Sequence, residues 1–291
     1  MRYGMNLLLW TDDATKDEFM PTLERLARLG FDGVEIPVFN PDEKAFARLG
    51  KRLDDLGLAR TAVTVRSAED DPISADATVR QKGIDATKRV VDCCRAGGME
   101  QLVGPLYAAL GRFSGAGPTA DEWQHGVASV RAMAEYAGSC GIGLGLEQLN
   151  RFEIYLLNTA ADCTRFVRAV DHPACGVLYD TFHSHIEEKS VRGAIRDCAA
   201  ALRHVHISES DRSTPGRGQV AWDETFDELA RIGYDGWLTI EAFGLALPAL
   251  AAATRIWRPM FVDELQLAGD GLAFMKREWA KRQTSAHRRA A

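Results

Sequence analysis

Eight short apolar or β-branched runs alternate with longer amphipathic stretches along the whole chain, and this alternation limits the possible folds more than any other feature. Such alternation is typical of βα units around a parallel sheet. The runs are too short to be core helices, and no linker rich in Pro, Gly or Ser divides the chain. The expected strands cover residues 3–10, 33–38, 59–65, 101–105, 142–147, 175–180, 203–208 and 237–242.

The stretches between these runs have the spacing of helices. Residues 17–30 place Phe19, Leu23 and Leu26 on one face and end at Gly30, which favours a helix that stops there. Residues 83–98, 122–141 and 223–236 repeat the scheme. Eight units in 291 residues match a single-domain α/β fold, the (β/α)8 TIM barrel, which typically has ~250 residues. We expect the barrel to occupy residues 1–283 and a disordered tail to follow at 284–291.

Composition excludes several classes of protein. The 35 basic and 41 acidic side chains give a net charge of −6, and no long basic run is present, which argues against nucleic acid as a partner. No apolar run approaches the ~20 residues that a membrane-spanning helix needs. The six cysteines form no Cys-x-x-Cys pair and the N-terminus has no secretory signal pattern, so we expect a reduced, cytoplasmic protein.

The last four expected strands each end in a possible metal ligand. In a TIM barrel the active site lies at the C-terminal ends of the strands, so these side chains should meet there. Three converging carboxylates would repel one another unless a divalent cation held them. The oxygen-rich set favours Mn²⁺, Mg²⁺ or Co²⁺ and leaves coordination positions for substrate oxygens. The four residues are Glu147, Asp180, His206 and Glu241.

A second polar residue follows each of the first three ligands at short range: Glu153, His183 and Arg212. An acceptor, a tunable donor and a forked donor suit the hydroxyls and carbonyl of a polyol, so we predict that these residues bind substrate. His204 lies two residues before His206 on the same strand face, and we expect it to fill the barrel below the metal. Glu35 ends the second strand, either as a buried, paired acid or as a substrate contact.

The residues resemble a known family, the ketose 3-epimerases of the tagatose, psicose (allulose) and L-ribulose type, which are xylose isomerase-like TIM barrels among the sugar phosphate isomerases and epimerases. The resemblance covers nearly the whole chain. Its most specific segments are LEQLNRFEIYLLNT (146–159), YDTFHSHIEE (179–188), HVHISESDR (204–212) and GRGQVAWDETFDELARIGYDGWLTIEAF (216–243).

The resemblance implies an activity and a site. Glu147, Asp180, His206 and Glu241 would hold Mn²⁺, while Glu153, His183 and Arg212 would bind the sugar. C3 of a free ketohexose or ketopentose would be inverted through a cis-enediolate, with Glu147 and Glu241 as the acid–base pair. We expect Trp10, at the end of the first strand, to form an apolar wall for the substrate. The family also implies a homodimer or homotetramer.

Two loops depart from the family pattern. In the tagatose and psicose enzymes a tryptophan of the loop after strand four lies over the substrate, but GPLYAALGRF (104–113) has aliphatic residues there. The loop after strand three, TVRSAEDDPIS (64–74), has more charges than the family suggests. Both loops would contact the far end of the sugar, C4 to C6. The sequence therefore predicts the type of reaction but does not identify the preferred ketose.

Alternative functions remain open at this point. Within the same barrel family, the chain could be a hydroxypyruvate isomerase, an inosose dehydratase or a C-glycoside deglycosylase. Endonuclease IV, a DNA-repair enzyme, shares this type of barrel, but it needs more histidines and a basic surface. A non-catalytic sugar-binding protein would keep its ligand after Glu147→Gln or Glu241→Gln, whereas an epimerase would lose turnover.

Overall fold

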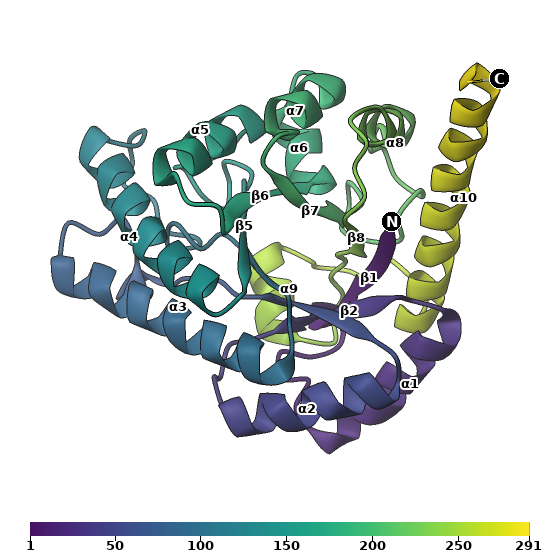
Figure 1. Cartoon of the computed structure of the whole chain (residues 1–291), viewed down its shortest axis with the longest axis horizontal. Helices are drawn as coiled ribbons and strands as arrows, with labels where there is room; N and C mark the ends of the chain where they lie inside the picture. Colours follow the sequence, from purple (N-terminus) through teal and green to yellow (C-terminus); the bar gives the residue numbers. More distant parts are fainter. Residues whose placement is uncertain (291) are drawn as a thin grey trace.

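The computed structural model describes residues 1–290, and of residues 284–290 the backbone only. Within this part, parallel strands close into a barrel in chain order (Figure 1). All eight predicted strands are present; the first ends four residues earlier than expected, and the ends of the others differ by at most two residues. They are β1 (Arg2–Asn6), β2 (Gly33–Pro37), β3 (Ala59–Val63), β4 (Gln101–Gly104), β5 (Gly143–Glu147), β6 (Cys175–Asp180), β7 (Leu202–Ile207) and β8 (Trp237–Ile240).

Helices surround the barrel and connect its strands (Figure 1). The four helices predicted from their spacing are present as α1, α3, α4 and α8. The helices are α1 (Met20–Leu29), α2 (Glu43–Asp55), α3 (Ala77–Gly97), α4 (Ala120–Ser139), α5 (Ala160–Val170), α6 (Thr181–Glu187), α7 (Val191–Cys198), α8 (Trp222–Arg231), α9 (Pro248–Thr254) and α10 (Glu264–Ala290).

The first strand is shorter than predicted. It ends at Asn6 because the side-chain Oδ1 of Asn6 accepts a hydrogen bond from the backbone N–H of Leu8 at 2.9 Å. This contact starts the 3₁₀ helix η1 (Leu7–Leu9). Trp10 therefore follows a 3₁₀ turn and does not end the strand, which corrects the position expected from the apolar run 3–10.

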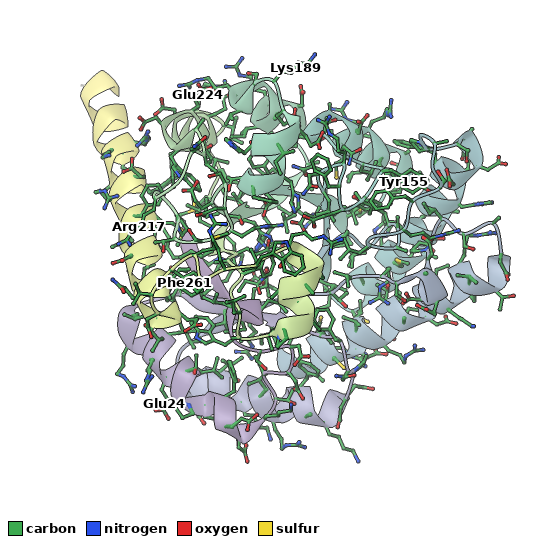
Figure 2. All side chains as sticks on the ribbon, turned by 180° about the vertical axis from the view of Figure 1, so that it is seen from behind. Glu24, Tyr155, Lys189, Arg217, Glu224 and Phe261 are labelled. Carbon is green, nitrogen blue, oxygen red and sulfur yellow. The ribbon has the colours of Figure 1, made fainter. Side chains whose placement is uncertain are left out.

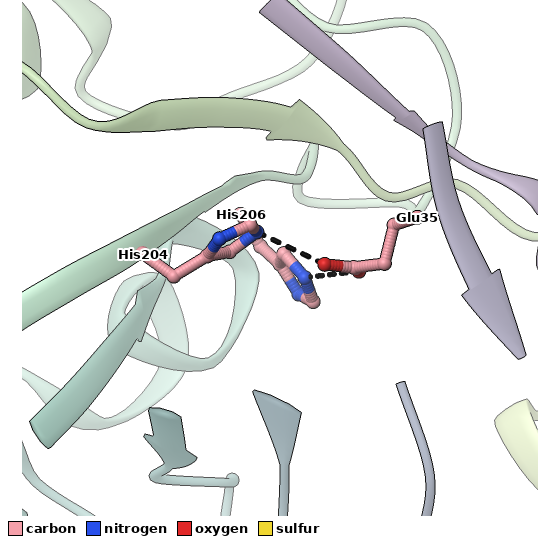
Figure 3. A group of neighbouring side chains, drawn as sticks. All are labelled: Glu35, His204 and His206. Atoms are coloured by element: carbon pink, nitrogen blue, oxygen red, sulfur yellow. Dashed lines mark hydrogen bonds and ion pairs between the residues drawn. The ribbon is translucent and has the colours of Figure 1, made fainter. Parts of the chain in front are cut away.

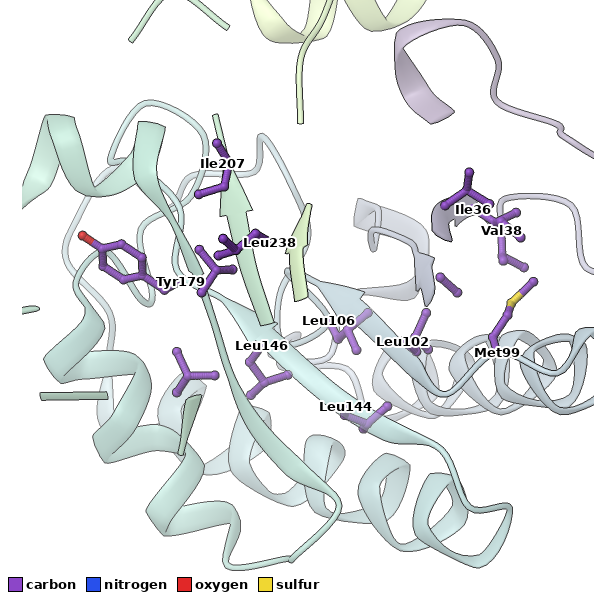
Figure 4. Close-up of a cluster of buried hydrophobic side chains, with 14 of the residues drawn as sticks. Ile36, Val38, Met99, Leu102, Leu106, Leu144, Leu146, Tyr179, Ile207 and Leu238 are labelled. Carbon is purple, nitrogen blue, oxygen red and sulfur yellow. The ribbon is translucent and has the colours of Figure 1, made fainter. Parts of the chain in front are cut away.

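Two separate apolar clusters fill the molecule. The larger one lies between the barrel and its helices and includes Leu102, Leu144 and Tyr179 (Figure 4). We call the smaller one the mouth cluster, since it joins inward-facing strand residues to the segment after β8. It consists of Leu8, Val63, Val103, Leu178, Phe243, Ala251 and Ile256. Ala251 belongs to α9, so this helix packs over the mouth of the barrel, as the view from behind shows (Figure 2).

Three further expectations concern the whole chain. All six cysteines are free thiols. None of the described helices has the length and apolar character that crossing a membrane requires, and the cytoplasmic location stays a prediction. The division into a barrel, 1–283, and a disordered tail, 284–291, also stays a prediction, because residue 291 and the side chains from 284 onward lie outside the described part.

Candidate active site

The four predicted ligands meet at one point in the mouth of the barrel. Glu147 ends β5, Asp180 ends β6, His206 is the penultimate residue of β7, and Glu241 directly follows β8. Each is buried, and one ligand atom from each lies within 4.8 Å of the others. The Nδ1 atom of His206 is 3.6 Å from Glu147 Oε1, 3.6 Å from Asp180 Oδ2 and 3.5 Å from Glu241 Oε1. Parallel strands in a closed barrel thus turn distant sequence positions into one cluster.

The hydrogen bonds of this cluster leave atoms free where an ion would bind. Asp180 uses Oδ1 to cap α6, accepting the N–H groups of Phe182 at 2.6 Å and His183 at 3.0 Å. Its Oδ2 has no hydrogen-bond partner among the described residues, and the same holds for Glu147 Oε1 and His206 Nδ1. A buried polar atom without a partner costs about 1–3 kcal/mol. Oxygen and imidazole donors are what Mn²⁺, Mg²⁺ or Co²⁺ accept, so these residues fit a divalent cation.

The closely spaced carboxylates of this cluster also favour a positive charge among them. Burial raises the pKa of Glu241 to about 8, with Glu147 and Asp180 adding to the rise while His206 and Arg212 oppose it. Burial disfavours the charged form of His206, yet the carboxylates of Glu35 and Glu241 hold its pKa well above its usual value. The mouth of the barrel therefore favours cations.

Arg212 supplies part of that charge from the loop after β7. Its side chain is only 3% exposed, and its guanidinium carbon lies 3.9 Å from the ring centre of Phe182 and 4.9 Å from that of Phe243. From between these rings, Nη1 donates to Oε2 of Glu241 at 2.5 Å, and Nη2 lies 2.9 Å from Nε2 of His183. The backbone φ of Arg212 is +60°, an uncommon conformation for a residue with a side chain and one often found at functional sites.

Asn150 links the other two predicted substrate residues. Its backbone N–H donates to Nδ1 of His183 at 3.0 Å, and its side-chain amide donates to Oε1 of Glu153 at 2.8 Å. No pattern in the sequence singled out Asn150, so this linking role was missed. Its neighbour Arg151 points away and pairs with Glu187.

Glu209 is a second residue that the sequence did not single out. It is fully buried, and its carboxylate accepts backbone N–H groups from residues 210, 216 and 220 and the indole N–H of Trp222. These bonds fold the loop after β7 around a single side chain. Since Arg212 is on this loop, Glu209 fixes the loop backbone from which the side chain of Arg212 extends into the site.

The two loops that depart from the family pattern are joined to each other. Asp71, after β3, accepts the backbone N–H of Ala109 at 3.0 Å and pairs with Arg112, both after β4. The N–H of Gly111 donates to the backbone carbonyl of Glu153 at 2.9 Å. The charged loop after β3 therefore supports the loop after β4, which in turn supports Glu153.

The sequence also drew attention to three other residues, namely Trp10, Glu35 and His204. Trp10 is half-buried and packs against the larger apolar cluster, and its contact with substrate stays a prediction. Glu35 lies in the middle of β2 and not at its end, which corrects its expected position, and it is fully buried and paired, as one of its two interpretations required. His204 lies beside it, with Nε2 at 3.0 Å from Glu35 Oε2, in the barrel interior where it was expected.

Comparison with known proteins decides the family. Residues 23–278 match the family model described as xylose isomerase-like TIM barrel. An L-ribulose 3-epimerase of Mesorhizobium japonicum is 34% identical over 276 residues, which are 94% of this chain and 93% of the relative. The chain belongs to the ketose 3-epimerases of the xylose isomerase-like TIM barrel family. It is accordingly an isomerase, and the family resemblance seen in the sequence is confirmed.

Other ketose 3-epimerases are similar to this chain over nearly its whole length. A D-psicose 3-epimerase of Ruminiclostridium cellulolyticum is 34% identical over 268 residues, covering 89% of each chain. A solved structure of an L-ribulose 3-epimerase superposes with a TM-score of 0.95 at 33% identity, covering all of this chain and 98% of its own. The ketose 3-epimerase fold therefore extends over the whole described chain.

Proposed function

We propose that this protein is a divalent-metal-dependent ketose 3-epimerase that inverts C3 of a free ketohexose or ketopentose, using Glu147 and Glu241 as its acid–base pair. The observation behind this proposal is the approach of both carboxylates to Nδ1 of His206, at 3.6 and 3.5 Å, from strands that are not adjacent. Inversion needs one group to remove a proton and another to return it on the opposite face. Two carboxylates from different sides of a barrel meet that need.

Glu147, Asp180, His206 and Glu241 would hold the ion, with Mn²⁺ as the first choice and Mg²⁺ or Co²⁺ as alternatives. When bound, the cation would polarise the C2 carbonyl of the ketose and so acidify the C3 proton. One carboxylate then takes the C3 proton, leaving a cis-enediolate, and the other gives a proton to the opposite face. The reverse reaction exchanges the two roles.

Arg212, His183 and Glu153 are proposed to hold the reacting end of the sugar. Because a backbone N–H donates to Nδ1 of His183, the ring proton lies on Nε2, which faces Nη2 of Arg212 at 2.9 Å. The N–H groups of His183 Nε2 and Arg212 Nη2 are both donors, so they do not hydrogen-bond to each other. Both can instead donate to a single oxygen of the substrate or enediolate. Glu153 adds an acceptor for a hydroxyl.

The far end of the sugar is proposed to lie against the mouth cluster. The ligands come from β5 to β8, so a sugar held there by C1 to C3 extends toward β1 to β4, where Leu8, Val63 and Val103 lie. Phe243 and Ile256 continue this apolar side. A phosphate would lose its hydration against such a surface, which favours an unphosphorylated ketose.

A single incubation tests the reaction. The protein with Mn²⁺ is given D-fructose, D-psicose, D-tagatose, L-sorbose or L-ribulose in D₂O, and C3 epimers are separated by chromatography. At least one ketose should yield its C3 epimer with solvent deuterium at C3. If every ketose returned unchanged and without deuterium at C3, the proposed function would be wrong.

We also propose a homodimer or homotetramer. Large apolar side chains are exposed on loops at the C-terminal ends of the strands, among them Phe152 at 73%, Trp257 at 69% and Val262 at 93%. Exposed large apolar side chains such as these are candidates for burial between copies of the chain. Light scattering on the purified protein measures the assembly, and a monomer at micromolar concentration would contradict this.

A further inference from the structure

Glu35 lies at the centre of a buried hydrogen-bond network below the proposed metal centre. The carboxylate is fully buried, and both histidine rings of β7 point at it (Figure 3). Its Oε1 is 2.7 Å from Nε2 of His206 and accepts the side-chain amide of Asn6 at 2.9 Å. Its Oε2 accepts the hydroxyl of Thr61 at 2.9 Å and is 3.0 Å from Nε2 of His204. One side chain of β2 thereby connects β1, β3 and β7.

This network determines how His206 faces the proposed ion. An ionised carboxylate only accepts hydrogen bonds, so the ring proton of His206 lies on Nε2, beside Glu35. The other nitrogen, Nδ1, then faces Glu147, Asp180 and Glu241, and it offers its lone pair there when a metal ion takes the place of its proton. A histidine whose second nitrogen donates to a carboxylate is the usual arrangement for a metal ligand, because the carboxylate fixes the ring and raises its basicity.

The network reaches a second ligand through Asn6. The Oδ1 atom of Asn6 accepts the backbone N–H of Leu8, which fixes the orientation of the amide. Its NH₂ group then has one hydrogen for Glu35 Oε1 at 2.9 Å and one for Glu241 Oε1 at 3.3 Å. Glu241 and His206 are therefore both oriented from the same carboxylate, one through an amide and one directly.

We propose that Glu35 is a positioning residue of the metal centre, which holds His206 and Glu241 in place for one ion, and that Glu35, His204 and His206 do not form a second metal site. These three residues could hold an ion by their spacing alone. However, an ion between them would have to replace the Nε2 proton of His206, whose Nδ1 already faces the first ion. His206 would then need to lose both ring protons, while Asn6 and Thr61 already occupy the Glu35 oxygens. The inference rests on the proposed metal centre, but not on the identity of the sugar.

Metal affinity tests this inference without relying on turnover. Calorimetric titration with Mn²⁺ is done on the wild type, Glu35→Gln, Glu35→Met and Glu228→Gln. Glu228 is a matched control, because it is also a fully buried glutamate but pairs with Arg196 and Arg231 on the helices. Glutamine keeps a hydrogen-bond acceptor but loses the negative charge, so Glu35→Gln should raise the dissociation constant for Mn²⁺ about tenfold. Methionine keeps neither, so Glu35→Met should raise it nearer ~100-fold. Glu228→Gln should leave it unchanged.

The number of bound ions gives a second, independent result. Elemental analysis of the Mn²⁺-loaded wild type should find one ion per chain, and a second tightly bound ion would overturn the inference. Folded Glu35→Gln with wild-type Mn²⁺ affinity would overturn it as well, and Glu35→Gln carries the test if the methionine variant does not fold. Absence of epimerase activity in the wild type would reject the proposed function, yet weaker Mn²⁺ binding by the variants would still support the role of Glu35.

Discussion

Glu241 divides its two oxygens between two positive partners: Oε2 accepts a 2.5 Å hydrogen bond from Arg212, and Oε1 lies 3.5 Å from Nδ1 of His206. Asp180 divides its oxygens in a similar way, between the start of α6 and the same histidine. Asp180 is thus held by one oxygen while the other faces the proposed ion, and Glu241 is held by Arg212 on Oε2 and by a longer hydrogen bond from Asn6 on Oε1, the oxygen that faces the ion. Arg212 is therefore coupled to the centre even though it is not a ligand.

Arg212→Met should reduce kcat/KM about 10²- to 10³-fold, because a buried donor to the developing enediolate oxygen is lost. Mn²⁺ binding should not weaken, since a competing positive charge leaves the site. Arg212→Lys keeps the positive charge but loses the two-pronged guanidinium donor, so kcat/KM should fall less than in Arg212→Met. Steady-state kinetics with the best ketose and calorimetry with Mn²⁺ measure both effects. Weaker Mn²⁺ binding with unchanged kinetics at saturating metal would contradict this role.

Glu147→Gln and Glu241→Gln should each lower epimerisation about 10²- to 10⁴-fold at saturating Mn²⁺, as expected when a general acid or base is removed. Each variant should still exchange the C3 proton of one epimer with solvent, since the remaining carboxylate faces one side of C3. Deuterium incorporation followed by NMR from each epimer separately measures this. If one variant abolished exchange from both epimers while the other left both intact, a single base would be indicated.

Removal of divalent metal should lower the thermal stability. A ligand that binds only the folded chain stabilises it by about 2.7 kcal/mol at a concentration 100 times its dissociation constant. For a chain of this size, dialysis against EDTA should therefore lower the melting temperature by on the order of 5 °C, and added Mn²⁺ should restore it. Calorimetric melting curves test this, and equal curves with and without EDTA would argue against the metal centre.

Glu228, which lies away from the proposed metal centre, should make the stability of the fold depend on pH. Hydrogen bonds from Arg231 and Arg196 lower its pKa to about 2, against the opposing effect of burial. A carboxyl whose pKa is depressed on folding adds stability above its unfolded pKa, and this is lost as the pH falls toward the folded value. Glu228→Gln should cost roughly 1–2 kcal/mol at pH 7, because both arginines are half exposed and screened.

The measurement is urea unfolding of the wild type and Glu228→Gln between pH 7 and pH 3. The difference in unfolding free energy should be constant down to about pH 5 and shrink below it. A difference that grew on acidification would contradict the predicted sign.

The strands, and the meeting of the four proposed ligands at one point, were predictable because they depend on local patterns. Each strand is a short apolar run, and a residue at the end of a barrel strand has its place set by topology alone. The partners of Glu35 were not predictable, since they come from three other strands and their pairing depends on the barrel register. Trp10 was misplaced because the apolar run 3–10 hides the turn that Asn6 starts. Asn150 and Glu209 hold loops whose paths the sequence does not specify.

Part of the mouth cluster comes from a different half of the barrel than the proposed ligands. The proposed ligands all come from the second half of the barrel, whereas Leu8, Val63 and Val103 come from the first half. Mutations of these three residues can therefore change part of the apolar side that is proposed to meet the far end of a sugar without replacing a proposed ligand, whereas Phe243 and Ile256 of the same side come from the second half. In evolution, substitutions at these three positions would let the preferred ketose change without rebuilding the proposed ligand set.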